Sequence, residues 1–92
     1  MPQGPDDPVE LLEFPCAYEI KAMGVAGAEF ETCVKSVISR HLVDDEIRSI
    51  RTRESRHGKY VSVTCEIEAI SRVQLDAIYL DLNSEPGVLM TL

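Results

Sequence analysis

Three cysteines and two histidines are the side chains of this sequence best suited to metal binding or nucleophilic chemistry. Cys33 and His41 lie eight positions apart on an expected helix, which corresponds to about 12 Å along the axis. That distance is too long for a thiolate–imidazolium pair. His57 lies in a polar turn beside Arg56 and Lys59, where solvation explains it. We therefore expect no metal site, no cofactor and no catalytic residues.

Cys16, Cys33 and Cys65 are odd in number and widely spaced, so a disulfide framework is not expected. Reduced thiols are typical of the cytoplasm, and an unpaired cysteine usually packs as a small hydrophobe. Glu66 and Glu68 share a strand face at about 7 Å, but nothing nearby predicts a pocket that would shift their pKa values. We expect a protein that is not an enzyme.

A glycine-bearing turn, Met23-Gly24-Val25-Ala26-Gly27, lies between an expected strand and an expected helix. Backbone N–H groups at such a turn can hold an anion. The turn lacks the lysine and hydroxyl of a P-loop and the three glycines of a dinucleotide site. Two interpretations stay open: Gly24 and Gly27 serve only the geometry of the turn, or they contact a small ligand.

Basic residues cluster in one region of a chain whose net charge is −7. The cluster consists of Arg48, Arg51, Arg53, Arg56 and Lys59. Charge on an edge strand discourages unwanted pairing, which is one interpretation. The other is a docking patch for an acidic partner or an anion. The acidic net charge opposes binding to nucleic acid or to anionic membranes, and neither is expected as a partner.

The elements that would position these residues follow from hydrophobic periodicity. Residues 16–23 and 60–69 alternate in parity, which predicts two half-buried strands. Residues 46–54 are β-prone but charged, as in an edge strand, and residues 88–92 form a short last strand. Apolar spacing of three and four predicts helices over 30–42 and from Ser71 to Leu82.

The second expected helix begins with Ser71 and Gln74, which fit a capping box. The following residues are expected on its buried side: Ile70, Val73, Ala77, Ile78, Leu80 and Leu82.

The order strand, helix, strand, strand, helix, strand predicts an α+β fold. It is the ferredoxin-like βαββαβ sandwich, with a four-stranded antiparallel sheet in the order 4-1-3-2 and both helices on one face. The opposite face has no cover within the monomer. It is expected to present Glu19, Lys21, Met23, Tyr60, Ser62, Thr64, Glu66 and Glu68.

At 92 residues the chain makes one domain. Residues 1–8 are acidic and proline-rich, so they are expected to form a disordered N-terminal extension. Residues 9–92 form the single domain. No apolar run approaches the roughly 20 residues of a membrane span, and the N-terminus does not resemble a signal peptide.

Several short motifs in a fixed order resemble the YbeD-like family of small bacterial proteins of unknown function. These are Leu11-Leu12-Glu13-Phe14-Pro15, Tyr18-x-Ile20-Lys21-x-Met23-Gly24, Ser55-x-x-Gly58-x-Tyr60-x-Ser62-Val63-Thr64, Gln74, Ile78-Tyr79 and Val88-x-Met90-x-Leu92. The resemblance covers residues 10–92 and implies a ferredoxin-like fold similar to amino-acid-sensing ACT domains. It implies no established activity. Members are often encoded beside lipoate-attachment enzymes. The acidic N-terminal extension and the charged region 44–56 depart from the family pattern.

Two functions are compatible with these observations. The first is a regulatory or adaptor domain that binds a partner protein, or a second copy of itself as a homodimer. Met23, Tyr60 and Thr64 would then lie in a sheet-face contact, and Arg48, Arg51 and Arg53 would contact a partner at the sheet edge. The alternative is an ACT-like sensor of an amino acid or small anion, connected to lipoate metabolism, with Gly24 and Gly27 at the ligand.

Overall fold

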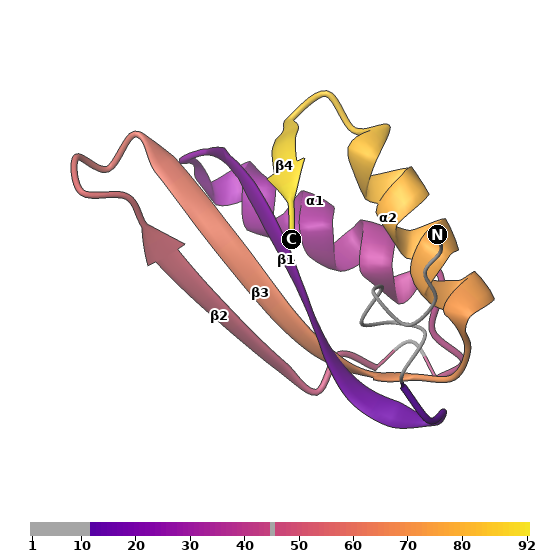
Figure 1. The fold of residues 1–92 in the computed structure, drawn as a ribbon. Coiled ribbons are helices and arrows are strands. Elements are labelled where there is room, and N and C mark those ends of the chain that lie inside the picture. Colours follow the sequence, from indigo (N-terminus) through magenta and orange to yellow (C-terminus); the bar gives the residue numbers. More distant parts are fainter. Residues whose placement is uncertain (1–11, 45) are drawn as a thin grey trace, which may run out of the picture.

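The computed structural model describes residues 12–44 and 46–92 as one sheet covered by two helices (Figure 1). The elements follow the chain as β1 Cys16–Val25, α1 Ala28–Ser39, β2 Ser49–Glu54, β3 Tyr60–Ala69, α2 Arg72–Asn83 and β4 Val88–Thr91. The expected disorder of residues 1–8 lies outside the described residues.

The sheet has the order β2-β3-β1-β4, with all neighbouring strands antiparallel. This confirms the ferredoxin-like arrangement, with β1 and β3 central and β2 and β4 at the edges. Figure 1 shows α1 and α2 on the same side of the sheet. The β2–β3 hairpin extends past the helices.

The core lies between this side of the sheet and the helices. Side chains of one parity on each central strand face the core, and several of them are fully buried, among them Ile20 on β1 and Val63 on β3. Their cross-strand partners share that parity, since Ile20 lies opposite Cys65 and Ala22 opposite Val63. From α1, Val34, Val37 and Ile38 complete the core. The alternation that identified the strands therefore also identified their buried face.

Several element boundaries differ from the expectation. β1 continues to Val25, because Gly24 stays in the strand at a register shift opposite β4 instead of ending it. α1 ends at Ser39, so the last turn contains no basic residue and Arg40 is the C-cap. β2 begins at Ser49, three residues later than expected.

The expected buried side of α2 was partly wrong. Val73 and Leu80 are 77% and 74% exposed, and Ile70 is also exposed. The core-facing residues are Gln74, Leu75, Ile78 and Leu82. Because apolar residues occur all round this 12-residue helix, its periodicity does not single out one face. Leu75, Ile78 and Leu82 follow one another by three and four positions, so they form the face that packs on the sheet.

Gln74 is buried because its amide finds partners inside the protein. The backbone N–H of Gln74 donates to the Ser71 hydroxyl at 3.0 Å, and the side-chain Oε1 of Gln74 accepts from the Ile70 backbone N–H at 2.8 Å. The capping box is therefore present, with the return bond one residue earlier than in the standard pattern. The Nε2 group donates to the carbonyl of His41 at 3.0 Å, which ties α2 to the segment after α1.

Candidate functional site

The sheet face opposite the helices, here called the open face, carries the predicted partner-binding residues of β1 and β3. Met23 lies opposite Ser62, and Tyr60 lies opposite Val25, so all four side chains share this face. Thr64 also belongs to it by parity but is only 6% exposed. Its expected exposure was wrong, because a short side chain between the longer Lys21 and Arg51 on the neighbouring strands is shielded from solvent.

One part of the open face is apolar. Met90 on β4 lies opposite Met23, and Leu92 exchanges backbone hydrogen bonds with Lys21 at 2.8 and 3.2 Å. Val25, Met90 and Leu92 are 58%, 49% and 65% exposed. We define the apolar patch as Met23, Val25, Tyr60, Met90 and Leu92. It spans three adjacent strands.

Sequence reasoning included Met23 and Tyr60 but missed the other three members of the patch. The signal for Val25 was the parity it shares with Met23, which was overlooked because the strand was expected to end earlier. Met90 on β4 and Leu92 just after it share a parity, but a strand of four residues shows too little alternation to reveal its face.

Farther along the open face, charges are paired within the sheet. Arg48 donates to Glu68 at 3.0 Å, and Arg51 contacts Glu19 at 3.1 Å across β3. The Ser49 hydroxyl donates to Glu66 at 3.4 Å. We call this region, with Glu19, Glu66 and Glu68, the acidic end. Arg48 and Arg51 therefore point over the sheet toward carboxylates, whereas they were expected to face a partner at the edge of β2.

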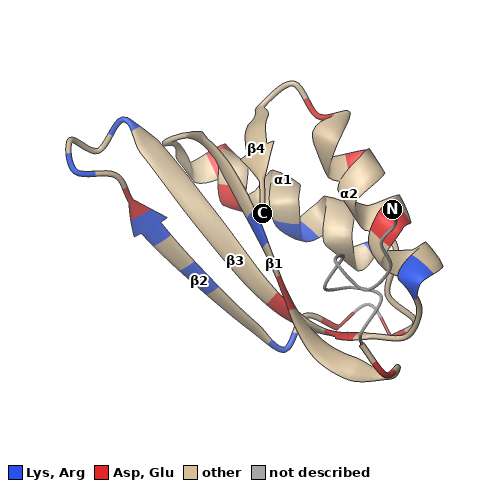
Figure 2. Ribbon diagram, in the orientation of Figure 1, with Lys and Arg blue, Asp and Glu red and all other residues tan. Residues whose placement is uncertain are grey.

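Arg53 is placed differently from Arg48 and Arg51. It lies opposite Ser62 beside the apolar patch and forms no ion pair with a residue that the structure describes. Arg56 and Lys59 are exposed in the following turn, where Lys59 lies 5.5 Å from the centre of the Tyr60 ring. Figure 2 shows Lys and Arg gathered along β2 and its hairpin.

A pocket of about 180 Å³ opens between the apolar patch and these cations. It is lined by Met23, Arg53, Glu54, Ser55, Tyr60, Val61 and Ser62. We call it the hairpin pocket. It brings together three of the six residues predicted for partner binding, whereas Arg48, Arg51 and Thr64 do not line it.

The two glycines predicted to contact a ligand have different surroundings. A side chain at Gly24 would overlap the ring of Phe30 and the carbonyl of Gly87, so close packing explains this glycine. Gly27 precedes α1, and a Cβ there would meet nothing within 4 Å. It borders an open groove of about 380 Å³, lined by Val25, Ala26, Gly27, Glu29, Phe30, Cys33, Pro86, Gly87 and Leu89. We call this the turn groove.

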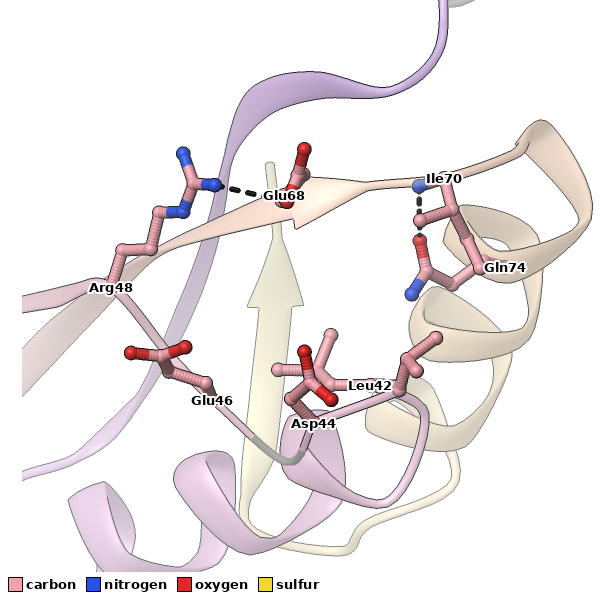
Figure 3. Close-up of a pocket in the computed structure, with 8 residues that line it drawn as sticks. Leu42, Asp44, Glu46, Arg48, Glu68, Ile70 and Gln74 are labelled. Carbon is pink, nitrogen blue, oxygen red and sulfur yellow. Dashed lines mark hydrogen bonds and ion pairs between the residues drawn. The ribbon is translucent and has the colours of Figure 1, made fainter.

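A smaller pocket of about 80 Å³ lies beside the acidic end (Figure 3). Its lining residues include Asp44, Glu46, Arg48, Glu68 and Gln74. Arg48 is bound to Glu68, and the Gln74 amide is bound to Ile70, as the dashed lines show. Two of its strongest polar groups are thus already bound to neighbours within the pocket wall.

The cysteine environments disfavour the reactive thiolate form. Burial raises the pKa of the Cys65 thiol to about 11. Burial, together with the hydrogen bond to Glu85 at 3.5 Å, also raises the pKa of Cys33. All three cysteines are free thiols. Within residues 12–44 and 46–92, no three His, Cys, Asp or Glu side chains are arranged to hold a metal ion.

The family model described as "Protein of unknown function (DUF493)" matches residues 9–92. The chain belongs to this family. Curated relatives are UPF0250 proteins. That of Chromobacterium violaceum is 40% identical over 87 residues, covering 95% of this chain and 98% of the relative. The protein NE1487 of Nitrosomonas europaea is 40% identical over 82 residues, covering 89% of this chain and 94% of the relative. The expected family of small bacterial proteins of unknown function is confirmed.

Two solved structures share the fold at low sequence identity. The solution structure of protein HP0495 from H. pylori has a TM-score of 0.71 at 16% identity and covers 100% of this chain and 94% of its own. The C-terminal domain of the MgtC protein from Mycobacterium tuberculosis has a TM-score of 0.68 at 17% identity and covers 89% of each chain. They establish the architecture alone. None of the helices described here is long and apolar enough to cross a membrane.

Proposed function

We propose that this DUF493 protein is a regulatory or adaptor domain, without enzymatic activity, that binds a partner protein through its open face. The observation that carries the proposal is the apolar patch, which lies uncovered beside Arg53. Aromatic residues, methionine and arginine are enriched at the centres of protein interfaces. The patch supplies all three types within adjacent strands.

The sheet edges are less suited to binding than the face. β2 carries the exposed charged residues Arg51, Arg53 and Glu54, and charge on an edge strand discourages the addition of another strand. β4 has only four residues and a register shift opposite Met23 and Gly24, and such irregularity also limits strand pairing. We therefore assign the contact to the open face and not to edge-strand addition.

The side-chain chemistry supports a role in binding. The thiols of Cys33 and Cys65 have raised pKa values, which favour the protonated, unreactive form. The acidic end places its carboxylates in exposed ion pairs and hydrogen bonds with β2. Neither arrangement activates a nucleophile or a general base.

Affinity purification of the tagged full chain from its native host, followed by mass spectrometry, tests this proposal. Met90→Glu places a charge in the exposed patch and should reduce recovery of the partner by about tenfold or more. Leu80→Glu is the matched control, because it places the same charge on an exposed apolar residue of α2. Equal recovery with wild type and Met90→Glu, or loss only with Leu80→Glu, would contradict the proposal.

A second candidate function is an ACT-like sensor that binds an amino acid or small anion in the turn groove. Its support is the size of the groove, about 380 Å³, together with the open space beside Gly27. Pockets for small molecules usually begin near this volume. A homodimer that brings two grooves together would be compatible with this function.

Thermal unfolding in the presence of amino acids and lipoate-pathway metabolites tests the sensor. A bound ligand should raise the melting temperature by several degrees. Gly27→Val should abolish that shift while preserving the fold, because its side chain would project into free space. A flat response across the panel, or a shift unchanged in the variant, would exclude this site.

A further inference from the structure

The hairpin pocket combines an apolar floor with a cationic rim. Met23 and Tyr60 contribute apolar side-chain surface on the open face, and Arg53 stands at the edge on β2. The volume of about 180 Å³ is close to that of a cavity that holds one benzene molecule, about 150 Å³. The pocket therefore has room for one leucine-sized or ring-sized side chain.

The charge around the pocket is opposite to that of the whole chain. Residues 51–60 contain four cations and a single carboxylate, whereas the full sequence has a net charge of −7. The carboxylate is Glu54, which lines the pocket together with Arg53. Because Arg53 has no ion pair within the described part of the chain, its guanidinium is available for a carboxylate in a two-bond geometry.

These observations together specify one kind of ligand. We infer that the hairpin pocket binds an acidic peptide segment of a partner protein, with one apolar side chain in the pocket and a neighbouring carboxylate on Arg53. Arg56 and Lys59 are exposed in the same hairpin and attract further acidic residues of the segment. This inference rests on the proposed function and names the chemistry of its partner.

The same surface is poorly suited to a nucleic acid strand. Single strands are bound by a continuous cationic groove with successive aromatic side chains for stacking. Here the open face offers one aromatic residue, Tyr60, and a short distance along the sheet Glu19, Glu66 and Glu68 present carboxylates. A peptide with one apolar anchor needs only the pocket and its rim.

An NMR titration of the uniformly ¹⁵N-labelled full chain tests the inference directly. The probe is the peptide acetyl-AEEFEEA-amide, and the controls are acetyl-AEEAEEA-amide, which lacks the anchor, and acetyl-AKKFKKA-amide, which reverses the charge. The first peptide should shift the backbone amides of the pocket-lining residues, foremost Arg53, Tyr60 and Ser62. Both controls should bind at least about tenfold more weakly.

Two variants with the same change in net charge locate the contact. Arg53→Gln should weaken binding of acetyl-AEEFEEA-amide about fivefold or more. Lys35→Gln, on an exposed position of α1, should leave the dissociation constant within about twofold, because long-range charge effects are screened at physiological salt. Ser62→Tyr should also block binding by filling the pocket.

Several results would overturn the inference. They are absence of binding, shifts confined to another surface, equal binding of the anchorless peptide, or tighter binding of decauridine RNA. The affinity purification with Met90→Glu distinguishes failure of the acidic-peptide inference from failure of the proposed function. A partner lost with Met90→Glu and no binding of the peptide would refute only the acidic-peptide inference. A partner insensitive to Met90→Glu would refute the role of the open face itself.

Discussion

The two ends of the open face use Arg51 and Arg53 of β2, and Arg48 just before that strand, in different ways. At the acidic end, Arg48 and Arg51 are each within 3.1 Å of a glutamate on the same sheet. At the hairpin end, Arg53 stands beside the exposed apolar patch with no ion pair to a described residue. The short segment from Arg48 to Arg53 therefore supplies cations both to a region where they are paired with carboxylates and to a region where Arg53 has no ion pair with a described residue.

The difference shows which part of an acidic protein is suited to recognise another acidic molecule. Paired surface charges are already compensated and contribute little to binding or stability. Unpaired charge beside apolar surface gives both electrostatic steering and area to bury. The presence of cations on β2 is thus less informative than the partners that each cation has.

The largest expected effect concerns the backbone that supports the hairpin end. Gly24→Val should destabilise the protein by about 3 kcal/mol, because the new side chain overlaps Phe30 and the Gly87 carbonyl. Gly27→Val, in open space but at the N-cap of α1, should cost no more than about 1 kcal/mol, because valine is a poorer N-cap residue than glycine. Urea denaturation measures both. Similar losses in the two variants would contradict the packing described around Gly24.

Measuring stability as a function of pH tests the burial of Cys65 on the helix-facing side of β3. This strand contributes residues to both ends of the open face. The pKa of Cys65 is about 11 in the folded state against an ordinary value of 9.0. Between these values the unfolded chain loses the thiol proton while the folded chain keeps it. Stability should therefore fall by about 2 kcal/mol as the pH rises from 9 to 11.

Urea denaturation of Cys65→Ala supplies the comparison for this pH dependence. Burial also raises the pKa of Tyr79, so the variant should retain part of the alkaline loss and show a smaller slope than wild type. Cys16→Ala serves as the matched control, because it removes a partly buried thiol at the start of β1. If stability fell with pH as steeply in Cys65→Ala as in wild type, the assignment of this alkaline loss to Cys65 would be contradicted.

The hairpin turn that carries Arg56 and Lys59 gives an intermediate effect. Gly58 has a φ of +72°, in the left-handed region that favours glycine. Gly58→Ala should cost about 1 kcal/mol, and Gly58→Asn should cost less, since asparagine tolerates this conformation better. Thermal unfolding monitored by circular dichroism would measure both variants. An equal loss in the two would indicate that the backbone angle is not the cause.

The smallest expected effect on stability comes from the ion pair at the acidic end, to be compared with the loss of Arg53 at the hairpin end. A double-mutant cycle between Arg51 and Glu19, whose side chains are both more than half exposed, should give a coupling of about 0.5 kcal/mol. The coupling should decrease in 1 M NaCl. Arg53→Ala should leave the stability within about 0.3 kcal/mol of wild type. A loss at Arg53 as large as that at Arg51 would remove the distinction between the ends.

The strands could be predicted from the sequence because alternation reports both the element and its buried face. Tyr60 and Val63 lie on opposite faces of β3, as their parity requires. The buried side of α2 could not be predicted in the same way. Leu80 and Leu82 are both apolar, and only packing against the sheet decides that Leu82 is buried and Leu80 is exposed.

The candidate site was predictable only in part, because pairing across strands depends on register. Arg51 and Glu19 are far apart in the sequence and meet over β3 only after all three strands are aligned. The shielding of Thr64 has the same origin, in the longer side chains on both neighbouring strands. The two glycines at the turn likewise differ only through the elements that pack against them.

The most direct test of the difference between the ends is a pair of charge reversals, one at Arg53 and one at Arg48. The binding of acetyl-AEEFEEA-amide would be measured by fluorescence anisotropy for Arg53→Glu and for Arg48→Glu, which change the net charge equally. The account predicts that Arg53→Glu weakens binding at least about tenfold, while Arg48→Glu stays within about threefold of wild type. Equal losses in the two variants would show that only net charge matters and would contradict the account.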